Sequence, residues 1–220
     1  MRPLSLLESR VLGVLVEKSL TVPDSYPLSL NALTLGCNQK TARDPVISAT
    51  DAEVQGAADA LKALSLAFES SGSRVSRYEH NLGRALALPS QSVALLATLL
   101  LRGAQTASEL RAGAERLHRF ADVSAVEGFL EELAGRADEK GGPLVVKLPR
   151  APGAREPRWT HLLSGPPDPS AFAQAGAGES PVVAVTEVAA LRTRLALAEA
   201  ELARLRGIVE RLCAELGIAP

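Results

Sequence analysis

RYEHNL at residues 77–82 returns as RWTHLL at residues 158–163, with arginine, an aromatic residue, histidine and leucine in matching positions. Each copy follows a segment of helical character, and these two segments also match at one constant offset: Val54, Gly56 and Leu61 correspond to Val126, Gly128 and Leu133. A turn-rich stretch separates the helix from the aromatic strand in both copies. The order helix, strand, turn, strand is typical of the second half of a winged helix-turn-helix unit. The sequence therefore predicts two such units in tandem.

Hydrophobic periodicity and helix-start signals place the other elements. Helices are expected at residues 4–19, 28–37, 50–64, 93–102, 106–117 and 122–135, and strands at 66–69, 74–80, 144–148 and 158–163. Thr50 with Glu53, and Thr106 with Glu109, have the spacing of a capping box, in which side chain and backbone at a helix start bond each other reciprocally. The predicted fold class is mainly α with small β-wings (α+β), with winged-helix domain 1 at residues 1–88 and domain 2 at residues 89–164.

The C-terminal part of the chain has a different character. Residues 165–180 are rich in proline and glycine, which predicts a flexible linker. Residues 181–217 then show apolar residues in alternating steps of three and four, with opposite charges at facing g and e positions, as in a parallel two-stranded coiled coil. The pattern predicts a parallel homodimer through Val188, Leu191, Leu195, Leu202, Leu205, Val209, Leu212 and Leu216. An amphipathic helix that folds back onto its own chain fits the same pattern, and the sequence leaves both interpretations open.

Composition restricts the functional classes. The net charge of −1 argues against non-specific binding of nucleic acid by the whole molecule, because neutralising phosphates needs a basic excess. No secretory segment follows Met1, and no apolar run is long enough to span a bilayer, so we expect a cytoplasmic protein without membrane association. Cys37 and Cys213 lie far apart, and Cys37 is expected to be a small buried filler.

Motifs for catalysis or metal binding are missing from the sequence. It contains no nucleophile elbow, phosphate-binding loop or zinc-binding histidine pair. His80 and His161 occupy matching ends of the two aromatic strands, where a structural role such as bonding a neighbouring carbonyl is expected. The sequence therefore predicts a non-enzymatic protein with no metal site and no cofactor.

Nucleic-acid binding is the main functional candidate, because winged helices commonly place their third helix in the major groove. Both expected third helices carry mostly carboxylates, however. The basic residues lie in the loop between the second and third helices and around the two wings: Lys40, Arg43, Arg74, Arg77, Lys147, Arg150, Arg155 and Arg158. If duplex DNA is bound, these residues are expected to contact it. A set of solvated charges on a protein-binding module is an equally consistent interpretation.

Four segments resemble the YceH-like family of uncharacterised bacterial proteins: residues 6–33, CNQKTARDPV at 37–46, RVSRYEH at 74–80 and LLATLLLRGAQTASELR at 95–111. The resemblance implies a tandem winged-helix fold and no established activity, since DNA binding in the family is inferred from fold alone. It also marks a polar signature loop and a second signature. The signature loop is Asn38, Gln39, Lys40, Arg43, Asp44 and Pro45, preceded by Tyr26 and Pro27, and the second signature is Arg102, Gly103, Gln105, Thr106 and Glu109.

The signature loop is the first choice for a functional surface, because clustered polar residues on loops are where binding sites concentrate. Arg43 and Asp44 could form an exposed pair on this loop or a buried strut that ties it to the body. The favoured function is DNA-associated and transcription-regulator-like. The alternative is a protein–protein interaction module, an accessory subunit that grips an unidentified partner chain without touching DNA.

Overall fold

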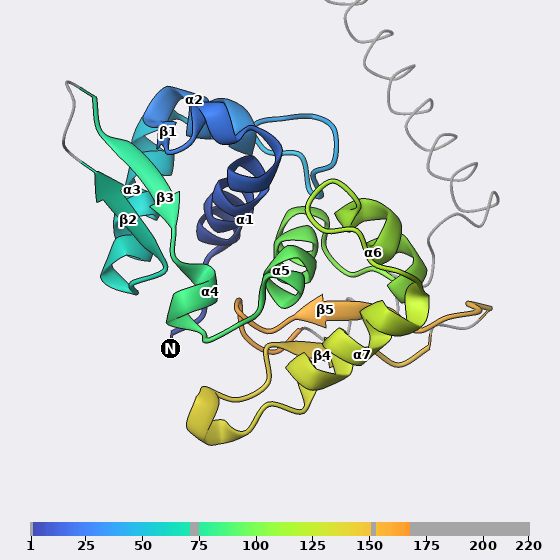
Figure 1. Cartoon of the computed structure of the whole chain (residues 1–220). Coiled ribbons are helices and arrows are strands. Elements are labelled where there is room, and N and C mark those ends of the chain that lie inside the picture. Colours follow the sequence, from blue (N-terminus) through green and yellow to red (C-terminus); the bar gives the residue numbers. More distant parts are fainter. Residues whose placement is uncertain (1, 71–74, 151–152, 168–220) are drawn as a thin grey trace, which may run out of the picture. The chain divides into compact units, whose positions relative to one another are not determined.

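The computed structural model describes residues 2–70, 75–150 and 153–167, which all belong to one compact unit (Figure 1). Arg74, most of the expected linker and the whole expected coiled coil lie outside these residues. The architecture is α+β, as expected, with small antiparallel sheets beside a helical core. The elements of the first half are α1 (Leu6–Thr21), the short 3-10 helix η1 (Pro23–Ser25), β1 (Leu28–Ser29), α2 (Leu30–Cys37), α3 (Asp51–Ala63), β2 (Ala67–Ser70) and β3 (Arg77–His80).

The second half repeats the order of the first. After the short helix α4 (Leu82–Ala85), it contains α5 (Ser90–Arg102), α6 (Ala107–Ala114), α7 (Val123–Ala134), the 3-10 helix η2 (Asp138–Lys140), β4 (Val145–Lys147) and β5 (Trp159–His161). In the first half β1 pairs with β3 at Leu28 and Tyr78, giving the sheet order β1-β3-β2. In the second half β4 pairs with β5, and an isolated bridge from Gln105 to Trp159 takes the place of a first strand. The two sheets are separate, and the aromatic residues of the sequence repeat occupy equivalent places.

Local signals in the sequence set the helix starts. Both expected capping boxes form: the Glu53 amide donates to Thr50 Oγ1 at 3.3 Å, and the Glu109 amide donates to Thr106 Oγ1 at 3.1 Å. A cap of this kind contributes about 1 kcal/mol to helix stability. The helix expected at residues 28–37 begins only at Leu30. Ser29 caps it through the Ala32 amide, which leaves the two preceding residues extended as β1.

The members of the sequence repeat divide by burial in the same way in both halves. The apolar and aromatic members are all buried: Val54, Leu61, Tyr78 and Leu82, and their counterparts Val126, Leu133, Trp159 and Leu163. The glycines are the exception, because Gly56 and Gly128 are exposed and a Cβ at either position would meet no atom within 4 Å. The repeat therefore keeps equivalent apolar and aromatic side chains buried in both halves and leaves one exposed glycine on each third helix, α3 and α7.

A single apolar cluster runs through both halves. Helices α1 and α5 pack side by side at its centre (Figure 1). Gly13 makes this approach close, since a Cβ there would lie 2.9 Å from Leu101 Cγ. The chain also returns to its start, where the Leu4 amide donates to the Leu163 carbonyl at 2.8 Å. The domain boundary at residue 88 stays a prediction, whereas the core itself is continuous across it. Within the described ranges, none of the helices has the length and apolar character that crossing a bilayer requires.

Candidate functional site

The signature loop is held from beneath by a buried arginine. The Arg43 side chain is 0% exposed and donates to Glu17 Oε2 at 2.6 Å and to the Gly36 carbonyl at 3.1 Å. Burial alone would raise the pKa of Glu17, but the hydrogen bond and charge of Arg43, with smaller contributions from Lys18 at 3.5 Å, outweigh it and hold that pKa below its usual range. Arg43 is therefore the strut that ties the loop to α1. It is not part of an exposed basic surface, so the expectation that it contacts nucleic acid does not fit its position.

A second buried arginine, which sequence reasoning missed, supports the same loop. Arg10 on α1 donates to the Cys37 carbonyl at 3.1 Å and to the Pro45 carbonyl at 2.5 Å. Burial, and then the nearby charge of Arg43, lower the pKa of Arg10. Cys37 is fully buried, as expected for a small filler, and burial raises its pKa to about 12. The sequence signal for Arg10 is a basic residue within an otherwise apolar helix segment.

The signature loop also closes on itself and reaches the second half. The Asn38 side chain donates to the Ala49 carbonyl at 2.8 Å and accepts from the Ala49 amide at 2.7 Å, which pins the two ends of the loop together. At its far side the Asp44 amide donates to the Leu101 carbonyl at 2.8 Å, in the last turn of α5. The loop thus ends beside the second signature, which begins at the next residue of that helix.

The two signatures meet in a pocket of about 460 Å³. The residues that line it come from the loop, from the end of α5, from the α5–α6 connection, from α6 and from the segment before β5: Asp44, Arg102, Ala104, Gln105, Glu109, Ala112, Gly113 and Arg158. Sequence reasoning named most of these polar residues but could not bring them together, because the segments that carry them lie far apart along the chain.

The predicted nucleic-acid contacts do not form one group. Arg77 donates to the Pro27 carbonyl at 2.8 Å, and Arg158 forms an ion pair with Glu109 at 3.0 Å. The Lys147 ammonium lies 5.2 Å from the centre of the Trp159 ring, a cation–π contact. The remaining candidates in the described ranges are exposed and have no hydrogen bond or ion pair there: Lys40, Arg150 and Arg155.

The third helices of both halves expose carboxylates, as their sequences predicted. On α3 the exposed charged residues are Asp51, Glu53 and Asp59, and its lysine, Lys62, is occupied by ion pairs to Asp59 and Glu69. On α7 the exposed charged residues are Glu127, Glu131 and Glu132. Both surfaces are therefore negative where a DNA-reading helix would face phosphates.

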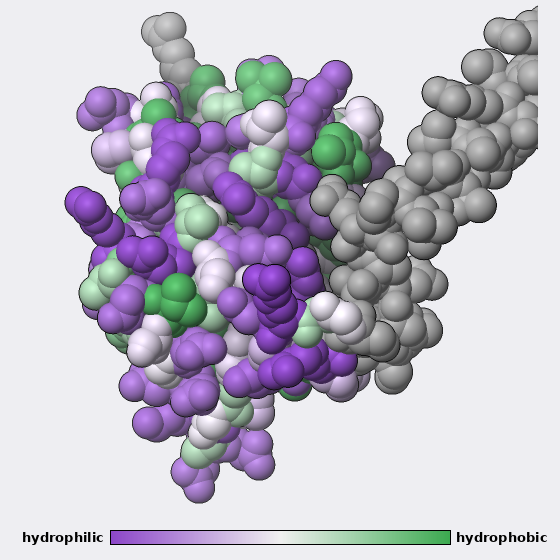
Figure 2. Space-filling view, turned by 90° about the vertical axis from the view of Figure 1, so that its right-hand side faces the viewer, coloured by the Kyte–Doolittle hydropathy of each residue, from purple (hydrophilic) through white to green (hydrophobic). Residues whose placement is uncertain are grey.

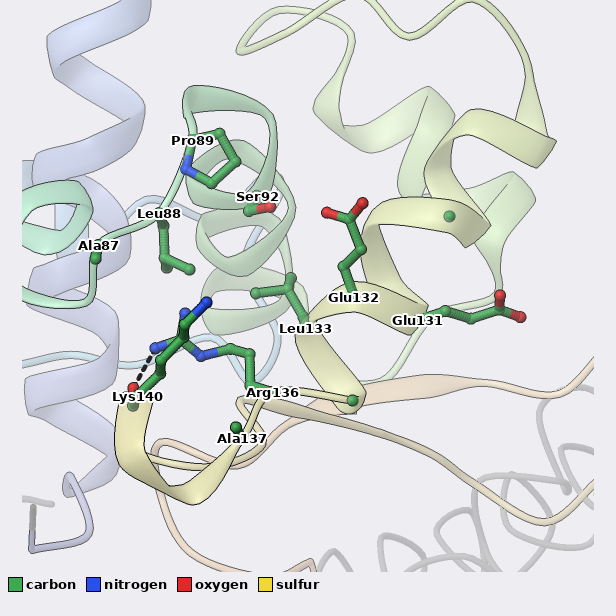
Figure 3. A pocket seen from close by; sticks show the side chains of 12 residues that line it. Ala87, Leu88, Pro89, Ser92, Glu131, Glu132, Leu133, Arg136, Ala137 and Lys140 are labelled. Atoms are coloured by element: carbon green, nitrogen blue, oxygen red, sulfur yellow. Dashed lines mark hydrogen bonds between the residues drawn. The ribbon is translucent and has the colours of Figure 1, made fainter.

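A larger pocket of about 710 Å³ lies beside α7 (Figure 3). Leu88, Pro89 and Leu133 supply its apolar part, and Glu131 and Glu132 line it from α7. Figure 3 shows the Arg136 side chain extending toward Lys140, whereas the side chains of Glu131 and Glu132 project away from the Arg136 guanidinium. The Arg136 guanidinium donates to the carbonyls of Leu86 at 3.1 Å and Gly142 at 3.4 Å, and to that of Lys140. This cation fixes the wall of the pocket and does not pair with the two carboxylates.

Neither of the matched histidines bonds a neighbouring carbonyl through its ring within the described ranges. His80 Nε2 contacts Ser19 Oγ at 3.2 Å, and Nδ1 of His80 and of His161 has no hydrogen-bond partner within the described ranges. Burial lowers the pKa of His80 and lowers that of His161 to about 4, so both rings are neutral at pH 7. Among the described residues, no group of three or more His, Cys, Asp or Glu side chains could hold a metal ion.

The surface offers no large apolar patch on the face that Figure 2 shows, where hydrophobic residues form small separate spots among hydrophilic ones. The large hydrophobic side chains with the greatest exposure are spread over many elements: Leu6, Leu20, Val22, Leu35, Val46, Phe68 and Val75. Scattered exposed residues of this kind are normal for a folded protein. Recognition through the described surface thus depends on polar groups and on the pockets.

Comparison with known proteins places the chain in a family. A family described as "Protein of unknown function, DUF480" matches residues 4–154. A "UPF0502 protein" of Methylibium petroleiphilum is 62% identical over 218 residues, covering 99% of this chain and 92% of that protein. A "UPF0502 protein" of Leptothrix cholodnii is 60% identical over 219 residues, covering 99% of this chain and 97% of that protein. The resemblance to the YceH-like proteins is in keeping with these matches, and the chain belongs to the DUF480 (UPF0502) family of uncharacterised bacterial proteins.

Proposed function

We propose that this protein is a non-enzymatic interaction module of tandem winged-helix type, which grips a basic, partly apolar segment of a partner protein. The observation that carries the proposal is the exposed carboxylate face of each third helix. On α7 this face adjoins the pocket that Leu88, Pro89 and Leu133 help to line. An apolar side chain of the partner would enter the pocket, while lysine or arginine side chains next to it would meet Glu131 and Glu132.

The exposed glycines of the two third helices also support a protein-binding function. Glycine inside a helix costs about 1 kcal/mol relative to alanine, yet Gly56 and Gly128 occupy equivalent exposed positions on α3 and α7 where an alanine would have space. Their packing in this chain gives no reason for glycine. A partner backbone that approaches the helix closely would give one, because only glycine leaves room for it.

The same charges argue against a DNA-reading role. Insertion of α7 into a groove would bring Glu127, Glu131 and Glu132 toward phosphates, which costs free energy instead of releasing counterions. The basic residues that could compensate are partly engaged: Arg43 is buried against Glu17, and Arg158 is paired with Glu109. The protein-binding function is therefore preferred over the DNA-associated one.

Affinity capture with the full-length protein tests the proposal. Bait protein is incubated with nuclease-treated lysate of the source organism, and captured chains are identified by mass spectrometry and crosslinking. Glu131→Lys with Glu132→Lys should abolish capture of a specific partner whose crosslinks map to α7. The control Asp24→Lys with Glu139→Lys changes the same net charge at exposed sites outside the pocket and should capture as wild type does. Equal capture by both variants would refute the α7 surface as the contact.

DNA contact by the wing of the second half is the other candidate. It is favoured by one observation, the exposure of Arg150 and Arg155 without partners in the described ranges, on the turn between β4 and β5. Gel-shift titration at about 50 mM salt decides between the two, because removing one phosphate contact flattens the salt dependence of log affinity by about one unit. Retention of duplex by wild type and its disappearance in Arg150→Ala with Arg155→Ala would establish DNA association in place of the protein partner.

A further inference from the structure

The pocket where the two signatures meet is lined by two charged side chains that form no hydrogen bond or ion pair in the described ranges. Arg102, the last residue of α5, is half-buried, and its side chain makes no hydrogen bond or ion pair with any residue there. The carboxylate of Asp44, an exposed residue of the signature loop, likewise has neither. The two groups do not neutralise each other, although both line the same space. A partly desolvated guanidinium without an acceptor is costly, so an acceptor from outside the chain would be bound favourably.

The other two charges of the pocket are already matched. Arg158 donates to Glu109 Oε1 at 3.0 Å and to the Ala104 carbonyl at 2.8 Å. This pair adds no net charge to the pocket, and the contacts engage both terminal nitrogens of the Arg158 guanidinium. Recognition of a charged ligand thus falls to Arg102 and Asp44.

A glycine keeps the wall beside Arg102 open. A Cβ at Gly113 would lie 3.3 Å from Arg102 Nη1 and 3.4 Å from Gln105 Oε1, so the guanidinium and the carboxamide stand around one small space. Gln105 is only 7% exposed, and its Nε2 makes only long contacts, of 3.4 Å, to the carbonyls of Thr98 and Gly103. A buried amide with such weak bonds has hydrogen-bonding capacity left for a ligand.

We propose that this pocket binds a small zwitterion of the α-amino acid type, with its carboxylate on Arg102 and its ammonium group on Asp44. The planar fork of a guanidinium matches a carboxylate in two parallel hydrogen bonds. A simple anion would be repelled by Asp44 and a simple cation by Arg102, whereas a molecule with both charges satisfies both groups. The pocket volume of about 460 Å³ suits a small molecule. The site is distinct from the α7 surface, and its ligand is independent of any partner chain.

Thermal denaturation of the full-length protein with defined probes tests the inference. The probes are the proteinogenic L-amino acids, one at a time, with sodium acetate as the anion-only probe and methylammonium chloride as the cation-only probe. At least one amino acid should raise Tm by about 5 °C at a concentration of roughly 100 times its Kd, and neither single-charge probe should do so. No shift with any amino acid, or an equal shift with acetate, would overturn the proposal.

Variants locate the binding. Arg102→Gln should weaken binding of the active amino acid about ten- to hundredfold by isothermal titration calorimetry, and Asp44→Asn should weaken it about tenfold. The Arg102 side chain makes no hydrogen bond or ion pair within the described ranges, so its replacement should leave the circular dichroism spectrum unchanged. Arg116→Gln removes an equally positive side chain that is exposed outside the pocket and should bind as wild type does. Unchanged affinity in Arg102→Gln would move the ligand elsewhere and refute the site.

Discussion

Gly128→Ala is expected to make the protein more stable and its partner complex weaker. The position lies inside α7, and a Cβ there would meet no atom within 4 Å, so no packing opposes the substitution. Alanine in place of glycine in a helix interior gains about 0.5–1 kcal/mol, through helix propensity and a less disordered unfolded chain. For a domain of this size, that corresponds to a rise in Tm of about 1–4 °C. Urea unfolding followed by circular dichroism measures the change directly.

A glycine of the same region provides the control. At Gly135 a Cβ would lie 3.2 Å from the Glu131 carbonyl oxygen, so Gly135→Ala should bring no comparable gain. The binding arm uses the affinity capture described above, in which Gly128→Ala should retain less partner than wild type despite its higher stability. A Gly128→Ala protein that is less stable than wild type would show that the helix face is not free. One that is more stable and captures partner equally well would remove the functional reason for the glycine.

Four further predictions concern the frame, its pH dependence, the thiol and the C-terminal segment. Arg43→Ala should lower the free energy of unfolding by about 3 kcal/mol in urea titration, because it removes the 2.6 Å partner of the largely buried Glu17 and leaves that carboxylate only the longer ion pair to Lys18, at 3.5 Å. A decrease of less than about 1 kcal/mol would contradict the role of Arg43 as a strut. The pKa of Glu17 is lowered from 4.5, so its stabilising contribution is complete above that value and is lost as pH falls through the folded-state pKa. In that acid range, urea titrations should therefore show that the free energy of unfolding depends less on pH in Glu17→Gln than in wild type. Equal pH dependence in the two proteins would count against the stabilising role of ionised Glu17. Cys37 should resist iodoacetamide in the native protein, since burial raises its pKa to about 12; mass spectrometry showing fast native modification at this residue would disprove its burial. Leu202→Lys should halve the mass found by sedimentation, because it puts a charge into the expected coiled-coil seam, and an undiminished dimer would exclude that seam as the interface.

Local sequence signals predicted the secondary structure of the described part well. Capping residues such as Thr50 and Thr106 start helices through contacts made within four positions, which a linear pattern can reveal. The internal repeat went further, since it predicted equivalent strand positions for Tyr78 and Trp159, and both side chains are buried at such positions. Short elements were less predictable: β1 has only two residues and is defined by its pairing with β3, not by composition.

The candidate sites depend on contacts that a linear pattern does not contain. Arg43 is one basic residue among several in a polar loop, and only its distance of 2.6 Å from Glu17, on another helix, reveals a strut. The meeting of Asp44 with Arg102 depends on the packing of α1 against α5, which brings the two halves together. The sequence predicted the exposed carboxylates of α7 correctly, because helix periodicity indicates which residues face solvent. It did not predict the role of Arg43, because the burial of a basic residue in a loop cannot be read from its residue type.

The packing of α1 against α5 joins two equivalent elements, the first helix of one half and the first long helix of the other. Symmetric homodimers use the same principle, with equivalent surfaces of two subunits in mutual contact. Here both surfaces belong to one chain, so the association of the two halves does not depend on protein concentration and dilution cannot dissociate them. Neither half is expected to survive alone, because a fragment ending near residue 88 would expose the stripe around Gly13 to water. Residues 2–167 should therefore unfold in a single thermal transition. A substitution that destabilises one half should lower the stability of the third helix in the other half by the same amount.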